Sequence, residues 1–291
     1  MMLRHIILAT VLWVGLPAAF SWGWGDEVHK LINGHATDLT HPPLGDFLRQ
    51  HRDRIVELST DADDRKESDP DEDSRHYIDF EYYGGAPHSS IPYHRGEAEV
   101  LYNYDNMAQW GTLPWRIIDV TWALRDAMAD ADWEQVIILA ADLGHYVADA
   151  HQPLHTTTNY DGQLTGNEGI HSMFEMHMVD KYRDHYRHPT PPLPVIESLP
   201  DSVFAWLFES YCDVESILAA DSRAREGLSS QKKEVVAQGF QADAEDIPQD
   251  YLERLYLQAG MTSWYHTSKA TVRLAALWLW AWDQAGQPSL P

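Results

Sequence analysis

The chain has 291 residues, 44% of them hydrophobic and 23% charged, which suits one large globular domain or two small ones. The formal net charge of −24 excludes a basic surface of the kind that binds nucleic acid, so an anionic substrate would need positive charge from bound metal ions. The single cysteine, Cys212, excludes an internal disulfide and is expected to be a buried packing residue.

Residues 1–23 have the pattern of a secretory signal peptide. Arg4 and His5 precede an apolar run over 6–20, and small residues follow at the cleavage positions. The run is short for a membrane span, although a retained anchor is the alternative interpretation. We expect an exported soluble protein, secreted or periplasmic, with a mature chain that begins at Trp24. The alternative cleavage site lies before Trp22.

The mature chain is expected to open with a helix, because Val28, Leu31 and Ile32 are apolar at helical spacing. Cleavage before Trp24 would free an α-amino group, which can chelate a metal together with its own carbonyl, and His29 lies about one turn further on. A Trp24 that simply packs in the core is the alternative.

Three further segments lead to the centre of the chain. A helix is expected over 44–58 after Pro42-Pro43, followed by an acidic stretch over 61–73 whose acids are mostly expected to be solvated. His76 begins an apolar and aromatic run and could be either a ligand or a core residue. After a loop over 84–92, helices are expected over 97–107 and from Pro114 to about Ala129.

The most informative stretch is 133–155. An apolar helix is predicted over 133–148, and His145 and Asp149 are four residues apart, so they share one face at its end. Pro153 cannot continue the helix, and His155 returns on the following loop. The spacing recurs in His171 and Glu175, and such helical pairs are typical ligands of a borderline-soft cation such as zinc. Together these residues predict a buried metal cluster.

The rest of the chain is also predicted to be helical. Residues 159–168 and 189–194 are expected to be loops, 201–219 an amphipathic helix, 228–250 polar and exposed, and 251–285 one long helix or two broken near Gly260. No alternating strand pattern appears. We therefore predict an all-α, single multi-helix domain of about eight helices around the metal cluster.

With these residues assembled, the chain resembles the zinc-dependent phospholipase C / S1-P1 nuclease superfamily over nearly all of residues 24–291. The resemblance is carried by four motifs: Trp24-Gly25…His29, Ala62-Asp63…His76-Tyr77, the His145–His155 block and the His171/Glu175 pair. It implies three Zn²⁺ ions per chain. One would be held by Asp63, His76, His145 and Asp149, a second by His155, His171 and Glu175, and a third by the Trp24 amine and carbonyl, His29 and the far oxygen of Asp149. Asp61 is the alternative to Asp63.

The resemblance also implies an activity, that of a zinc-dependent phosphodiesterase, a hydrolase acting on ester bonds. A water acidified between two zinc ions would attack phosphorus in line, with Asp63 orienting it. The chain is expected to act as a monomer without a stable protein partner. A non-catalytic exported zinc-binding protein is the hypothesis from another class.

Two substrate classes remain open at this stage. The Gly169–Glu175 segment and Glu27, which matches a choline-pocket acid, favour a phospholipase C acting on phospholipid head groups. Tyr77, at a position that stacks a base, leaves an S1/P1-type nuclease on single-stranded DNA or RNA as the alternative. Each branch has a departure: Asp73 replaces an aromatic residue of the phospholipases, and Glu175-Met176 replaces the Asp-Asn of the nucleases.

Overall fold

The computed structural model describes residues 25–84, 90–186 and 192–291, and within them every regular element is a helix. The predicted all-α fold in a single domain is confirmed. Residues 1–23, with the expected signal peptide, and the expected ligand Trp24 lie outside the described residues. None of the described helices is long and apolar enough to cross a bilayer.

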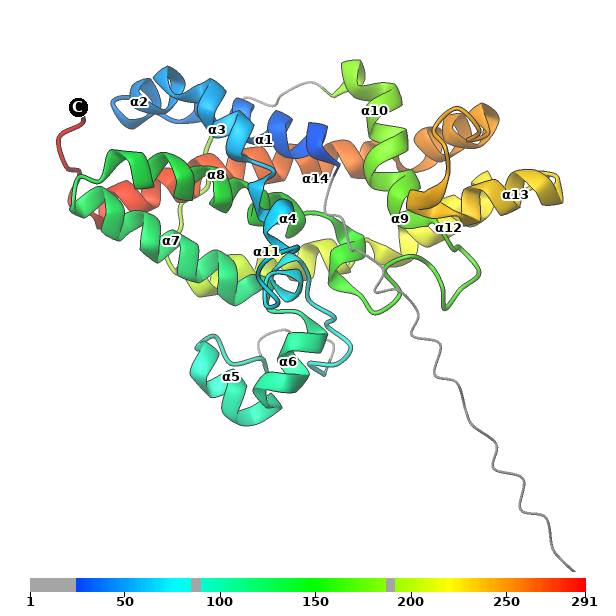
Figure 1. The fold of residues 1–291 in the computed structure, drawn as a ribbon, viewed down its shortest axis with the longest axis horizontal. Coiled ribbons are helices and arrows are strands. Elements are labelled where there is room, and N and C mark those ends of the chain that lie inside the picture. The colour runs from blue at the N-terminus through cyan, green and yellow to red at the C-terminus, as the bar shows by residue number, and fades with distance from the viewer. Residues whose placement is uncertain (1–24, 85–89, 187–191) are drawn as a thin grey trace, which may run out of the picture.

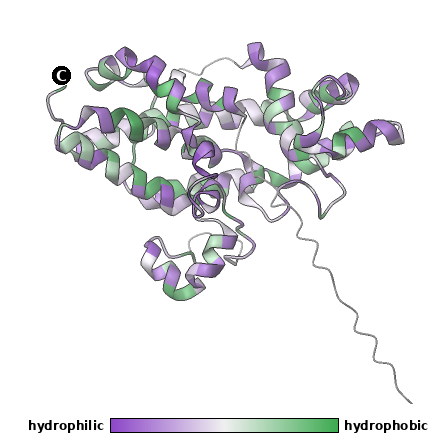
Figure 2. Cartoon of the chain, in the orientation of Figure 1, coloured by the Kyte–Doolittle hydropathy of each residue, from purple (hydrophilic) through white to green (hydrophobic). Residues whose placement is uncertain are grey.

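Four helices form the centre of the molecule: α1 (Asp26–Leu39), α7 (Leu113–Ala129), α8 (Trp133–Asp149) and α14 (Gln249–Gln284). They pack against one another, with α14 running along the length of the body and α7 beside α8 (Figure 1). α8 begins where the Asp132 side chain accepts the Gln135 N–H, and it buries one unbroken run from Ala140 to Asp149. Figure 2 shows hydrophobic residues concentrated where these helices meet. α14 is a single helix through Gly260, which settles the alternative left open by the sequence.

The close approach of α1 to α8 depends on Gly144. A Cβ at this position would lie 2.0 Å from Asn33 Oδ1, so a larger residue would push the two helices apart. Asn33 is itself buried and donates to the carbonyl of His29 within α1. The missing side chain at Gly144 therefore brings His29 next to His145, one residue further along α8.

Three segments predicted as single helices are each divided in two. Residues 44–58 form α2 (Leu44–Gln50) and α3 (Arg52–Leu58), 97–107 fall in α5 (Arg95–Tyr102) and α6 (Tyr104–Trp110), and 201–219 fall in α11 (Leu199–Tyr211) and α12 (Val214–Ala224). Asn103, with a φ of 69°, breaks the second pair, because a left-handed residue cannot continue a helix. In the first pair, side-chain contacts fix each half separately, since Arg49 donates to Thr37 O and Thr40 O and Arg52 donates to Gly34 O.

The helix count follows from these divisions. Of the fourteen α-helices in the described residues, eight have eight or more residues, and the other six are one or two turns long. One of the longer helices, α13 (Ser230–Ala237), lies in the polar segment expected only to be exposed.

Cys212 falls between α11 and α12 and is exposed, so the expectation that it packs in the core is wrong. α5 and α6 form an arm that projects from the body (Figure 1).

Candidate metal centre

Side chains from seven separate elements converge at the end of α8. Besides α1 and α8, these elements are α4 (Asp61–Arg65), η1 (Asp73–His76), η3 (Pro153–Thr156), α9 (Ile170–Ser172) and the π-helical turn η4 (Met173–His177). Eight of the nine expected ligands meet there: His29, Asp63, His76, His145, Asp149, His155, His171 and Glu175. All eight are almost wholly shielded from solvent, with Asp63 the least so at 8% side-chain exposure. Asp63, rather than Asp61, belongs to this cluster.

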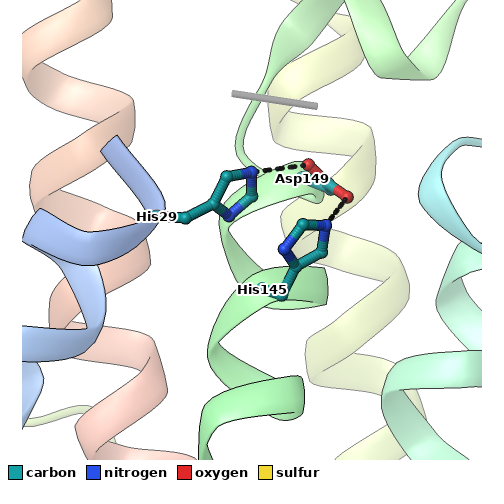
Figure 3. Close-up of side chains that lie close together, drawn as sticks. All are labelled: His29, His145 and Asp149. Atoms are coloured by element: carbon teal, nitrogen blue, oxygen red, sulfur yellow. Dashed lines mark ion pairs between the residues drawn. The ribbon is translucent and has the colours of Figure 1, made fainter. Parts of the chain in front are cut away.

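The eight side chains form three groups that could each hold a metal ion. In the first group His29 Nε2 lies 3.6 Å from Asp149 Oδ1, and His145 Nε2 lies 3.3 Å from Asp149 Oδ2 (Figure 3). The rings of His29 and His145 stack with centroids 3.9 Å apart and planes within 3°. A tetrahedral zinc site with bonds of 2.0–2.1 Å places its ligand atoms about 3.3 Å apart, so these distances suit one cation.

The second group joins α4 and η1 to α8. His76 Nδ1 lies 2.9 Å from Asp149 Oδ2, 3.1 Å from His145 Nε2 and 3.6 Å from Asp63 Oδ1. The two Asp149 oxygens thus face different neighbours: Oδ2 faces His76 and His145, whereas Oδ1 faces His29 and lies 3.5 Å from His155 Nδ1. Asp149 therefore lies between the first and second groups.

The third group consists of His155, His171 and Glu175. His155 Nε2 and His171 Nε2 are 3.1 Å apart, and both face Glu175 Oε2, at 3.7 Å and 2.9 Å. His171 follows Gly169, whose φ of 88° and tight contact with Val236 O admit only glycine. The Asp161 carboxylate accepts the N–H groups of Gly169 and His171 and so fixes the start of this helix.

Hydrogen bonds on the far side of the rings determine which nitrogen faces the centre. His145 Nδ1 is 2.8 Å from Ser59 O, and His155 Nδ1 is 2.9 Å from His76 O. A carbonyl only accepts, so each Nδ1 carries a proton, and in a neutral ring the Nε2 lone pair then points at the centre. Lone pairs and carboxylate oxygens therefore face one another, an arrangement that requires a cation or additional protons.

The crowding of lone pairs and carboxylates also shifts the pKa values of these residues. Burial alone would lower the pKa of His145, but the carboxylates of Asp63 and Asp149 raise it to about 9. Burial, together with His145, lowers the pKa of His29 to about 3, and burial lowers that of His171 to about 4. Burial also raises the pKa of the Glu175 carboxyl to about 8. In the metal-free protein, protons therefore take up part of the charge that a cation would balance.

Several buried polar atoms in the cluster have no hydrogen-bond partner among the residues that the structure describes. They are His29 Nδ1 and Nε2, His76 Nε2, Asp149 Oδ1 and Glu175 Oε1. Leaving a buried polar group unsatisfied costs about 1–3 kcal/mol, and natural proteins rarely tolerate several at one place without a function. The donor set of imidazoles and carboxylates fits a metal such as zinc.

A cavity of about 180 Å³ opens beside the third group. His155 and His171 form part of its wall, and the rest is Asp73, Tyr77, Asp79, Gln109, Leu154, Thr157 and Tyr160. Burial and the neighbouring Glu81 raise the pKa of Asp79 to about 7. Tyr77 thus lines the same cavity as the candidate ligands His155 and His171. Glu27 does not: it pairs with Arg183 and lines a different hollow.

Sequence reasoning missed three polar side chains that contact the cluster. Lys66 Nζ donates to Asp63 Oδ1 at 2.7 Å, and Gln152 Nε2 donates to Glu175 Oε2 at 2.8 Å. Glu72 is fully buried, although the acids of this stretch were mostly expected to be solvated. A signal existed for Glu72, because it precedes His76 by four residues, the spacing that singled out His145 and Asp149.

The chain matches no family model, and no curated protein matches it. The resemblance to the phospholipase C / S1-P1 nuclease superfamily therefore rests on the motifs and on the placement of their residues.

Proposed function

We propose that the chain is a zinc-dependent phosphodiester hydrolase of the phospholipase C / S1-P1 nuclease type. One observation carries the proposal: buried Asp149 faces His76 and His145 with Oδ2 and His29 with Oδ1, so that it would help to hold a cation in both the first and the second group. Zinc ions held in the three groups would supply Lewis acidity toward a phosphoryl oxygen and would acidify a water. The expected third ion would also use Trp24, which lies outside the described residues.

Two residues of the chain would act on the water and the phosphate. Although burial opposes ionisation, His145 and Lys66 lower the pKa of Asp63 to about 2, so this carboxylate is ionised at neutral pH. Asp63 lies at the edge of the cluster. Its carboxylate would orient the attacking water by accepting a hydrogen bond from it. Lys66, held 2.7 Å from Asp63 Oδ1, would contribute positive charge toward an anionic phosphate in a strongly acidic protein.

The cavity bears on the choice of substrate. Tyr77 and Tyr160 offer aromatic rings there, and Asp79 and Gln109 offer polar groups for a base edge. Glu27, the residue that favoured a choline head group, points to another hollow. We therefore place a phosphodiester of single-stranded nucleic acid first among the substrates. A choline phospholipid is second, since tyrosine rings with the carboxylates of Asp73 and Asp79 also suit a quaternary ammonium group.

The test compares two substrates with one preparation of zinc-loaded protein. Single-stranded DNA and phosphatidylcholine vesicles are incubated side by side, with and without a zinc chelator, and nucleotide and phosphocholine release are measured. Chelator-sensitive release of nucleotides supports the first substrate, and release of phosphocholine supports the second. A chain that retains zinc yet hydrolyses neither phosphodiester would contradict the proposal and favour a non-catalytic zinc-binding protein.

A further inference from the structure

Glu72 is a buried carboxylate outside the three metal groups. It immediately precedes η1, and its side chain is 0% exposed. Arg75 Nη1 lies 2.5 Å from Glu72 Oε2, and the Tyr146 hydroxyl donates to Glu72 Oε1. A carboxylate buried in this way is costly unless it is paired, and both oxygens are engaged. The structure thus holds a negative charge at a fixed position behind the centre.

A larger network anchors this carboxylate. Arg65 forms a two-pronged contact with Asp142, at 3.2 Å and 3.0 Å, and also donates to the Tyr146 hydroxyl at 3.2 Å. Asp142 and Tyr146 belong to α8, the helix that carries His145 and Asp149, while Arg65 belongs to α4. The network therefore ties Glu72 to the two helices that supply most of the second metal group, so its position is fixed relative to them.

Glu72 also lies beside His76. Glu72 Oε1 lies 3.5 Å from His76 Nε2, within ion-pair distance, and this nitrogen is buried without a hydrogen-bond partner among the described residues. The opposite nitrogen, Nδ1, faces Asp63, His145 and Asp149. A neutral imidazole carries one proton, so its Nδ1 lone pair faces the centre only when the proton sits on Nε2. A carboxylate in front of Nε2 favours that tautomer.

His76 is oriented differently from two other histidines of the cluster. His145 and His155 present Nε2 to the centre and are fixed through Nδ1 by the backbone carbonyls of Ser59 and His76. His76 presents Nδ1 and is backed by a charged side chain. A charged acceptor makes the ring a more basic ligand than a carbonyl does, which strengthens its bond to a cation.

From this geometry we propose that Glu72 is a positioning residue: it sets the tautomer and orientation of His76 so that Nδ1 binds the metal of the second group. The proposal rests on the metal centre proposed above. It predicts that Glu72 acts on metal affinity through His76 and touches neither substrate nor metal.

The experiment measures Zn²⁺ affinity, without any substrate. Metal-free protein is titrated with Zn²⁺ against a competing chelator, and with Co²⁺ by absorption. Glu72→Gln keeps the size of the side chain and removes its charge, and we expect about 10–100-fold weaker binding at one of the Zn²⁺ sites, with a changed Co²⁺ spectrum. Glu67→Gln is the matched control, because Glu67 is an exposed acid of the same segment and its loss should leave affinity unchanged.

A second variant covers the case in which Glu72→Gln fails to fold. Tyr146→Phe removes one donor to Glu72 and keeps the charge, so Zn²⁺ binding should weaken by less than in Glu72→Gln. Wild-type affinity in a folded Glu72→Gln, or in Tyr146→Phe where Glu72→Gln does not fold, would overturn the proposal, even if thermal stability falls. A wild-type chain that binds no Zn²⁺ would overturn the metal centre itself and this proposal with it.

Discussion

Asp149→Asn is the substitution to which the centre should be most sensitive. The carboxylate is fully buried, and its two oxygens lie within 3.6 Å of nitrogens from His29, His76, His145 and His155. The amide has nearly the same shape, so packing is retained while the negative charge is lost. One of its two oxygen ligands also becomes an NH₂ group, which cannot bind a cation.

The size of the effect follows from Coulomb's law. Unit charges 4 Å apart interact by about 4 kcal/mol at an effective dielectric constant of 20, and a divalent cation doubles this to about 8 kcal/mol. If the remaining ligands compensate for half, about 4 kcal/mol is lost, which corresponds to a roughly 10³-fold lower affinity. Because Asp149 faces the first and second groups, at least two metal ions should be affected.

Metal content after gel filtration, measured by mass spectrometry, tests this directly. Asp213→Asn is the control, since Asp213 is a half-buried aspartate that pairs with a buried histidine, His266, outside the cluster. We expect the control to retain zinc and thermal stabilisation by added Zn²⁺, and Asp149→Asn to lose both. Full zinc content in Asp149→Asn would refute the proposal that Asp149 helps to hold metal ions in the first and second groups.

Three further predictions follow from the same geometry. Gly144→Ala should lower the free energy of unfolding by about 1–3 kcal/mol in denaturant titrations, because its Cβ would overlap Asn33. In the metal-free protein, His145 and Glu175 have pKa values raised from 6.5 to about 9 and from 4.5 to about 8. The folded state therefore binds more protons than the unfolded state, so the melting temperature should fall as pH rises from about 6.5 to 9, and a rise would contradict these assignments. Tyr77→Ala should raise KM for single-stranded DNA by about tenfold or more, with Tyr82→Ala, outside the cavity, as the control.

The long helices could be predicted because apolar residues recur at helical spacing in their sequences. The segment 133–148 is apolar at helical spacing and is followed by Pro153, so the sequence predicted α8 (Trp133–Asp149) to within one residue. The breaks at His51, Asn103 and Cys212 were not predictable in this way, since apolar spacing continues across each of them. They depend on contacts with distant segments, such as Arg52 with Gly34, or on a left-handed backbone at a residue other than glycine.

The candidate site was predictable to the extent that its ligands occur in spaced pairs. The spacing of four placed His145 with Asp149 and His171 with Glu175, although the second pair spans a π-helical turn rather than a regular helix. The role of His76 was ambiguous, because its partner Asp149 lies 73 positions further along the chain. Local spacing in the sequence cannot reveal such a contact. Lys66 and Gln152 were not predicted, because each acts through a hydrogen bond to one ligand, Asp63 or Glu175. Such a contact has no sequence pattern of its own.

The unfavourable interactions among the buried side chains of the cluster themselves argue for a function. A sequence optimised only for stability would not place four imidazoles around one buried carboxylate. Nor would it leave His29 and Asp149 Oδ1 without hydrogen-bond partners in the described part of the chain. Outside the cluster, buried charges such as Asp221 are fully paired, with Arg225, Tyr251 and Asn167 around it. Atoms without a partner among the described residues also occur elsewhere, as at Arg116 Nε and Arg125 Nε, but those side chains are only half-buried. In the cluster, by contrast, five such atoms belong to residues that are 0% exposed, and they lie together where cations would complete them. This contrast is the strongest physical reason to expect that the folded protein acquires metal.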